Sequence, residues 1–203
     1  MRYSKQIIFE KIGTEGQKCL KNSKVTIVGI GAIGTRTAEL MARAGVGDIT
    51  LIDRDIVELS NLQRQTLFTE EDINKSKSFV AKEHLDKINS QIKIKAVFKE
   101  LSHKNIANEI KSDLIIDCTD SMETRFLINE FSIEKNIPWI FSSIIGSTGM
   151  VFNIVPKKTP CFNCIFQEPE EMLGTCDTEG ILNTTSSLIS SIQTTEAFKI
   201  LTK

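Results

Sequence analysis

The chain has 203 residues, of which 40% are hydrophobic and 25% charged, values typical of a globular protein with one well-buried core. The formal net charge of −1 excludes an overall basic field, so we expect no nucleic-acid partner. The charged N-terminus and the lack of a long apolar run predict neither a signal peptide nor a membrane span, and five cysteines outside a secretory context predict reduced thiols in the cytoplasm.

Short apolar runs alternate with helical patterns along the chain. The segments with a strand pattern are 24–31, 48–53, 92–98, 113–120, 137–144 and 149–156. The segments with a helical pattern between them are 33–44, 75–89 and 122–136. This alternation predicts an α/β fold, Rossmann-like and doubly wound, with a mostly parallel sheet covered on both faces. The last two strands have only a short link, so we expect them to pair antiparallel at the C-terminal side.

An amphipathic pattern closes the sequence. The apolar residues that fall on about a third of a helix circumference are Ile181, Leu182, Leu188, Ile189, Ile192 and Ile200. We interpret this stripe as the face of a helix that packs on the sheet.

A glycine loop lies between the first strand and the first of these helices. Gly29, Gly31 and Gly34 fit the pattern G-x-G-x-x-G. Glycine lets the backbone turn tightly and approach phosphate, and the helix N-terminus supplies free N–H groups. Asp53 ends the next strand, where a carboxylate can bind ribose hydroxyls. The motif predicts a nucleotide site and leaves NAD, FAD and ATP open.

The segment LSNLQRQTLF, residues 59–68, favours ATP. Asn61, Arg64 and Gln65 would lie just beyond the second strand, on the ligand edge of the sheet, and Lys77 would begin the following helix. A triphosphate requires cations and amide donors beyond a glycine loop. This combination predicts a site for ATP.

The segment DCTD provides a carboxylate at the same edge. The strand predicted over 113–120 ends in Asp120. Because Mg²⁺ binds one or two carboxylates together with phosphate oxygens, Asp120 is a candidate ligand for it.

Seven features occur in the order found in the ubiquitin-activating-enzyme superfamily: RYSKQIIF, VGIGAIG, LIDRDIVELSNLQRQTLF, Lys77, DCTD, PCFNC and GTCDTEGIL. Through nearly its whole length the chain resembles the prokaryotic branch, the ThiF/MoeB-type adenylyltransferases. The resemblance implies an enzyme that binds the C-terminal Gly-Gly tail of a ubiquitin-like or sulfur-carrier protein and adenylates its carboxylate with ATP. It also implies a single adenylation domain over 1–203. Its parts are a helical arm (1–22), a nucleotide-binding part (23–145), and the antiparallel strands, cysteine loop and C-terminal helix (146–203).

The resemblance assigns a role to each candidate side chain. Asp53 would bind the ribose, Asp120 would hold Mg²⁺, and Asp55 would lie near the metal and nucleotide. The residues that would engage the phosphates are Asn61, Arg64, Gln65 and Lys77. A terminal carboxylate is already ionised at neutral pH, so its attack needs no general base. The two histidines, His84 and His103, are therefore expected on a solvated surface.

Cys161 and Cys164 have zinc-ligand spacing, but a tetrahedral site needs four ligands. The family usually supplies a second pair after the last helix, where this chain ends at Lys203. The expectations left open are a missing zinc site, a site completed by other ligands, a truncated chain, and two free thiols.

Cys176 matches the family's mobile-loop cysteine, which in some members attacks the acyl-adenylate or joins sulfur transfer. A thiol near a helix N-terminus can have a lowered pKa, and a thiolate is the better nucleophile. The alternative is a bystander thiol. Cys118 is expected in a buried strand, and Cys19 is expected to pack in an N-terminal helix.

The segment RYSKQ carries Lys5 where the family has an arginine that reaches across a dimer to the partner's phosphates. Lysine keeps the charge but loses the bidentate fork, and Arg2 is the alternative donor. The resemblance thus implies a homodimer with Lys5 acting in trans, and a possible sulfurtransferase as further partner.

Several functions stay open at this point. The carrier could serve thiamin, molybdenum cofactor, tRNA thiolation or protein conjugation. A rival within the family adenylates a small molecule, a peptide or a modified tRNA base. Outside it, an NAD-dependent oxidoreductase lacks any recognisable hydride-transfer site, and a non-catalytic scaffold is disfavoured by intact Arg64, Lys77 and Asp120.

Overall fold

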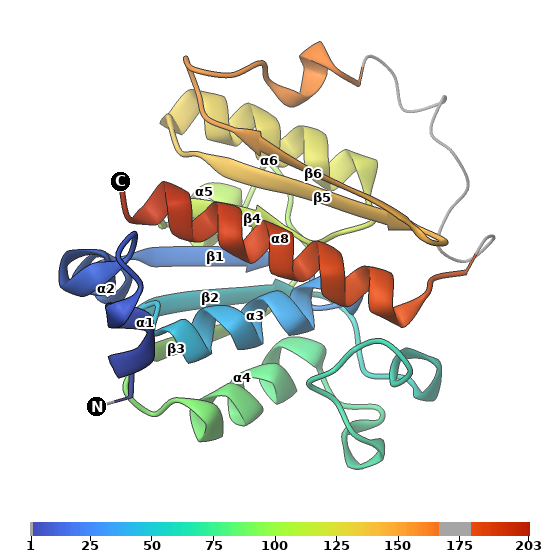
Figure 1. Ribbon diagram of the computed structural model, residues 1–203. Coiled ribbons are helices and arrows are strands. Elements are labelled where there is room, and N and C mark those ends of the chain that lie inside the picture. The colour runs from blue at the N-terminus through green and yellow to red at the C-terminus, as the bar shows by residue number, and fades with distance from the viewer. Residues whose placement is uncertain (1, 167–179) are drawn as a thin grey trace.

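Buried aliphatic runs form a six-stranded sheet. In the computed structural model, which describes residues 2–166 and 180–203, the strand order is β3-β2-β1-β4-β5-β6 (Figure 1). The strands are β1 (Lys24–Val28), β2 (Asp48–Asp53), β3 (Lys93–Phe98), β4 (Leu114–Asp117), β5 (Trp139–Ile145) and β6 (Thr148–Ile154). All neighbours pair parallel except β5 and β6, which pair antiparallel. The predicted fold class is confirmed.

Helices cover both faces of this sheet (Figure 1). On one face lie α3 (Ala32–Ala44), α4 (Lys77–Ile88) and α8 (Asn183–Leu201), and on the other lie α5 (Ile106–Glu109) and α6 (Met122–Lys135). Side chains alternate along a strand, so Leu51 of β2 joins one core and Ile52 joins the other. The central strands β1, β2, β4 and β5 are largely buried on both sides, as their apolar runs predict, whereas the edge strands β3 and β6 are partly exposed.

The N-terminal arm packs at the amino-terminal edge of the sheet. It consists of α1 (Ser4–Ile8) and α2 (Gly13–Asn22). Gln6 Nε2 donates to the carbonyl of Ala44 at the end of α3 (3.0 Å), and Asn89 Nδ2 donates to the Tyr3 hydroxyl (2.8 Å). These bonds fix the arm to the carboxyl ends of α3 and α4.

The strand that was predicted over 113–120 is shorter than expected. β4 ends at Asp117, because the Asp117 side chain accepts from the backbone N–H (3.0 Å) and hydroxyl (2.7 Å) of Thr119 and turns the chain out of the sheet. Cys118 is buried but lies just beyond the strand, and Asp120 lies in the following loop.

The apolar stripe predicted for the last helix is partly wrong. Ile189 is buried, and two other members, Ile181 and Ile200, pack partly against the core. The remaining members are exposed by 54%, 60% and 42%: Leu182, Leu188 and Ile192.

Polar and small side chains form most of the buried face of α8 instead. They include Thr185, Ser186, Ser190, Gln193, Thr194 and Ala197. Their size lets α8 approach α3 closely, and their hydroxyls have nearby acceptors: Ser190 Oγ donates to the carbonyls of Ile33 (3.0 Å) and Ser186 (2.7 Å). A satisfied hydroxyl can be buried at little cost, so hydropathy alone misassigned the face.

Among the described helices, none has both the length and the apolar character needed to cross a membrane.

Candidate functional site

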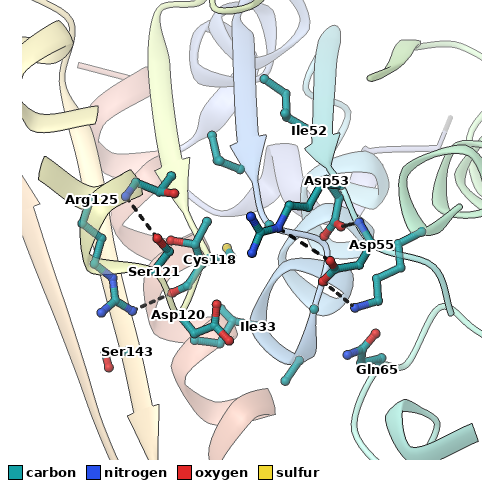
Figure 2. Close-up of a pocket in the computed structure, with 18 of the residues that line it drawn as sticks. Ile33, Ile52, Asp53, Asp55, Gln65, Cys118, Asp120, Ser121, Arg125 and Ser143 are labelled. Atoms are coloured by element: carbon teal, nitrogen blue, oxygen red, sulfur yellow. Dashed lines mark hydrogen bonds and ion pairs between the residues drawn. The ribbon is translucent and has the colours of Figure 1, made fainter. Parts of the chain in front are cut away.

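A cavity of about 490 Å³ opens beyond the carboxyl-terminal ends of β1, β2 and β4 (Figure 2). In open α/β sheets this is where ligands bind, at the point where the strand order reverses. The candidate residues that line it are Gly29, Gly31, Asp53, Asp55, Asn61, Arg64, Gln65, Lys77 and Asp120. They come from segments up to 91 positions apart (29 to 120), which the fold brings to one edge.

The glycine loop follows β1 and forms one wall. Gly29 has a φ of 87°, and a Cβ there would lie 2.8 Å from the carbonyl oxygen of Cys118. A Cβ on Gly34 would lie 1.9 Å from the carbonyl oxygen of Gly29, so Gly34 allows close packing of the loop and does not line the cavity. A Cβ on Gly31 would have the Gln65 amide nitrogen as its nearest neighbour, at 3.9 Å, so that position faces open space. A phosphate can approach the backbone there.

Asp53 braces this loop from the end of β2. Its carboxylate accepts the backbone N–H of Ile30 (2.6 Å) and of Asp55 (2.7 Å). Burial raises the pKa of the Asp53 carboxyl, while these backbone bonds and the nearby Lys77 ammonium oppose the rise. Asp53 thus holds both the glycine loop and the start of the next segment.

The segment between β2 and α4 supplies the cation and amide groups. It contains two short 3₁₀ turns, η1 (Leu59–Asn61) and η2 (Glu70–Asp72). Lys77 is buried, with its Nζ 3.2 Å from an Asp55 carboxylate oxygen. The Arg64 guanidinium is half-buried and donates to the Ser60 carbonyl at 2.9 Å.

The two amides of this segment differ. Asn61 uses its side-chain oxygen to cap η1 by accepting the Glu58 N–H (3.1 Å), so that oxygen already has a protein partner. Gln65 is only 4% exposed, and its Oε1 has no hydrogen-bond partner among the described residues. A buried polar atom in a cavity wall that lacks a protein partner is suited to a ligand.

The loop after β4 forms the opposite wall. Figure 2 shows Asp120 across from Asp53 and Asp55, beyond the end of a different strand. Within residues 2–166 and 180–203, the Asp120 carboxylate takes part in none of the hydrogen bonds and ion pairs observed. An exposed, unpartnered carboxylate beside a phosphate-binding loop fits a Mg²⁺ ligand.

Arg125 lines this wall of the cavity and forms a buried ion pair with Asp117, which the sequence interpretation missed. Arg125 Nε lies 3.4 Å from an Asp117 carboxylate oxygen, and both side chains are almost fully buried. Arg125 Nη2 also donates to the Thr119 carbonyl (2.5 Å), and its guanidinium lies 4.9 Å from the Phe141 ring centroid. Burial raises the pKa of the Asp117 carboxyl, and the Arg125 charge opposes this. The signal in the sequence was an arginine five positions after Asp120 within an otherwise ordinary helix.

The cysteines among the described residues do not complete a metal site. Cys161 precedes a third 3₁₀ turn, η3 (Phe162–Cys164), and Cys164 ends it, with their sulfur atoms 3.4 Å apart. No group of three His, Cys, Asp or Glu side chains that could hold a metal ion occurs within residues 2–166 and 180–203. The described residues therefore supply two of the four ligands that zinc needs. Cys176 lies outside the described residues.

The other two thiols are buried to different degrees. Cys118 is buried, and burial raises its pKa well above the ordinary value, so it is a poor nucleophile. Cys19 packs partly buried in α2, as expected.

One of the two histidine expectations is wrong. His103 is 79% exposed, in agreement with the sequence. His84 of α4 is only 25% exposed, with its Nδ1 against the Leu67 carbonyl and its Nε2 3.6 Å from an Asp72 carboxylate oxygen. The reason is that the long segment before α4 folds back over that helix and buries the ring.

Lys5 lies far from the cavity of its own chain. It is exposed on α1, at the amino-terminal edge of the sheet, whereas the cavity opens at the other edge (Figure 1). The 13-residue helix α3 spans the separation, about 20 Å at 1.5 Å per residue. Arg2 lies at the same distal edge, where it donates to the Ile88 carbonyl at 2.9 Å. Neither side chain therefore reaches its own glycine loop.

Comparisons with known proteins agree with this geometry. The chain matches the model of the ThiF family over residues 3–203. It is 40% identical over 204 residues to the sulfur carrier protein ThiS adenylyltransferase of Bacillus subtilis, covering 99% of this chain and 61% of that protein. It is 37% identical over 203 residues to the Escherichia coli protein of the same description, covering 99% of this chain and 81% of that one.

Among solved structures, E. coli MccB with AMPCPP and MccA is similar, with a TM-score of 0.88 and 25% identity. That match covers 99% of this chain and 63% of MccB. The chain thus spans less than two thirds of both the B. subtilis relative and MccB.

Proposed function

Because the chain belongs to the ThiF family, we propose that it adenylates the C-terminal carboxylate of a small ubiquitin-like or sulfur-carrier protein with ATP. The observation that carries the proposal is the convergence of Arg64, Lys77 and Asp120 on a cavity that contains a glycine loop. Two cations and a carboxylate suit a metal-bound triphosphate better than the pyrophosphate of a dinucleotide. The relatives named as ThiS adenylyltransferases, and the solved complex with AMPCPP, a triphosphate analogue, support the same assignment.

The reaction requires alignment and charge neutralisation more than proton transfer. A carboxylate oxygen of the carrier attacks the α-phosphorus, an acyl–phosphate bond forms, and the bond to pyrophosphate breaks. Negative charge develops on the departing pyrophosphate, which Arg64 and Lys77 would stabilise. Asp55, paired with Lys77 in the protein, would hold that lysine toward the phosphates. Gly29, Gly31, Asn61 and Gln65 would cradle the nucleotide and Asp53 would bind its ribose.

We propose magnesium as the metal of this site. Asp120 would bind it, and the ion would neutralise phosphate charge while bound. Zinc at Cys161 and Cys164 would need two ligands beyond the described residues, so we assign it no part in the reaction.

The carrier would offer a flexible Gly-Gly tail, and its adenylate would feed sulfur transfer, with a sulfurtransferase as a further partner, or protein conjugation. We place the enzyme in the cytoplasm and treat residues 1–203 as one adenylation domain.

The alternative substrate, a peptide, gains weight from the MccB complex with MccA. Pyrophosphate exchange with a Gly-Gly protein, compared with a short peptide, separates the two.

The nucleotide preference gives the first test. Isothermal titration should show binding of Mg·ATP and little or no binding of NAD, because Arg64 and Lys77 line the cavity beside the glycine loop, where they suit the charge of a triphosphate. Titration of AMPCPP serves as the control without turnover. Tight NAD binding in the absence of ATP binding would overturn the proposed function.

Cys176 is proposed as the acceptor thiol for the activated carrier. Cys176→Ala should keep carrier-dependent ATP–pyrophosphate exchange but lose any covalent thioester, or any acyl-disulfide formed after a sulfurtransferase has loaded the thiol as a persulfide, since adenylation precedes attack by the sulfur, which releases AMP. Intact mass spectrometry of the enzyme–carrier mixture detects the adduct, and Cys19→Ala is the matched control that should retain it. An undiminished adduct or unchanged transfer to the downstream product in Cys176→Ala would make the thiol a bystander.

Lys5 is proposed to act on the partner's site in a homodimer. A two-fold contact repeats itself, so the amino-terminal edge of each chain can lie over the cavity of the other. One charge near a triphosphate contributes on the order of 1–3 kcal/mol, so Lys5→Ala should slow adenylation roughly tenfold to a hundredfold. Lys5→Arg should keep or raise the rate.

Mixing tests this directly. Lys5→Ala and Asp120→Ala chains are combined under conditions where subunits exchange. A mixed dimer has one site with both changes and one with neither, so exchange activity should return. No recovery, although heterodimers are shown to form by native mass spectrometry, would mean that Lys5 does not act in trans.

A further inference from the structure

Gln193 of α8 is a buried amide at the back of the cavity, and it does not line the cavity itself. Its side chain is completely buried, in a helix face where the other buried polar groups are hydroxyls. An amide in such a place stabilises the fold only if its donors and acceptor all have partners. Its partners therefore indicate what it is positioned to hold.

The donors of Gln193 point at the carboxyl-terminal end of β4 and at the first half of β5. Nε2 donates to the Asp117 carbonyl (2.9 Å) and the Ser142 hydroxyl (2.9 Å), and more weakly to the Ile140 carbonyl (3.4 Å). The Ser142 hydroxyl donates to the same Asp117 carbonyl at 2.9 Å. The last residue of β4 thus has two side-chain donors on one oxygen.

The acceptor of Gln193 joins this strand end to the helix that carries the glycine loop. Oε1 accepts from the Thr37 hydroxyl of α3 (3.3 Å) and from the Cys118 thiol (3.4 Å). A single side chain therefore contacts the helix behind the phosphate cradle and the segment that leads to Asp120.

The same segment is held from the other face of the sheet by Arg125. That side chain contacts the Asp117 carboxylate and the Thr119 carbonyl. Between them, Gln193 and Arg125 fix the main chain on either side of Cys118, and the first carboxylate beyond these anchors is Asp120.

We propose that Gln193 is a positioning residue for magnesium-dependent nucleotide binding, acting through the Asp117–Asp120 segment on the carboxylate of Asp120. This inference rests on the proposed function, because it takes Asp120 as the metal ligand. Gln193 does not touch the nucleotide; it fixes where the ligand carboxylate lies relative to the glycine loop. Loss of its amide should weaken the contribution of Mg²⁺ to ATP binding and leave metal-free ATP binding nearly unchanged.

The experiment measures ATP affinity by isothermal titration over a series of Mg²⁺ concentrations, including EDTA. Gln193→Met keeps the side-chain volume and removes the amide. It should shift the Mg²⁺ dependence to concentrations about tenfold higher, the order expected from one or two lost hydrogen bonds. Thr194→Val is the matched control: Thr194 is also buried on α8, but its hydroxyl donates to the Ser190 carbonyl of its own helix (2.7 Å) and, among the described residues, to no group of the sheet. That variant should keep the wild-type Mg²⁺ dependence.

A double-mutant cycle with Asp120→Asn tests the route. If Gln193 acts through Asp120, Gln193→Met should have no further effect on the Mg²⁺ dependence once Asp120 is changed. Additive effects, an unshifted Mg²⁺ dependence, or an equal loss of affinity with and without Mg²⁺ would each overturn the inference.

If Gln193→Met does not fold, Ser142→Ala removes the other donor to the Asp117 carbonyl and should produce the same shift, smaller in size. Failure of the wild-type chain to bind ATP would overturn the proposed function and this inference together, whereas ATP binding that is indifferent to Gln193 overturns the inference alone.

Discussion

Replacement of Asp120 by alanine should lower carrier-dependent ATP–pyrophosphate exchange about a hundredfold, the order observed when one group that stabilises transition-state charge is removed. The physical reason is that Asp120 is an exposed carboxylate on the cavity wall with no partner among the described residues, so its charge is available to the metal. Arg64→Ala should have an effect of the same order, because its guanidinium would otherwise neutralise phosphate charge.

Asp113→Ala is the matched control for this measurement. Asp113 precedes β4 at the opposite edge of the sheet, where its carboxylate accepts the Lys24 N–H at 2.8 Å. It should leave exchange unchanged. Exchange in Asp120→Ala within a few-fold of wild type, with the protein folded, would remove Asp120 from the reaction.

The largest effect on stability is expected at the buried ion pair. Asp117→Asn should leave the Arg125 guanidinium buried without its counter-charge, which costs about 3–5 kcal/mol and lowers the melting temperature by roughly 6–20 °C in a chain of this size. Two of the remaining partners of Arg125, the Thr119 carbonyl and the Phe141 ring, carry no full negative charge. Thermal unfolding followed by circular dichroism measures the change.

The double variant Asp117→Leu with Arg125→Met separates charge burial from packing. With both charges gone, no uncompensated ion remains in the core, and most of the lost stability should return. A single variant that melts within about a degree of wild type would show that water reaches the pair, contrary to its burial.

Much of the fold follows from the sequence because its central strands are apolar runs. Residues buried on both faces of a parallel sheet are mostly apolar, so the runs mark where these strands lie, although β1 and β4 each end three residues before the predicted segment does. The glycine pattern and the polar residues after β2 could likewise be placed, since parallel strands present their carboxyl ends at one edge.

The polar groups behind the site could not be placed in this way. Gln193 and Ser190 look like solvent-facing residues in the sequence, and only contact with β4 and α3 makes them part of the core. Arg125 and Asp117 are eight positions apart in different elements, so their pairing depends on how α6 returns over the sheet. His84 was misjudged for the same reason, because its partners lie 12 and 17 positions earlier, in the long connection between β2 and α4.

The hydrogen bonds between Asp53 and the glycine loop also decide whether the cost of ordering that loop reduces folding stability or nucleotide affinity. Its bonds to the N–H groups of Ile30 and Asp55 join protein to protein, so the loop takes its shape during folding. The conformational entropy lost there belongs to the free energy of unfolding and does not reduce nucleotide affinity. Substitution of Asp53 should therefore lower the free energy of unfolding and also weaken nucleotide binding. Nucleotide affinity measured alone would overstate the direct contribution of a contact between the Asp53 carboxylate and the ribose.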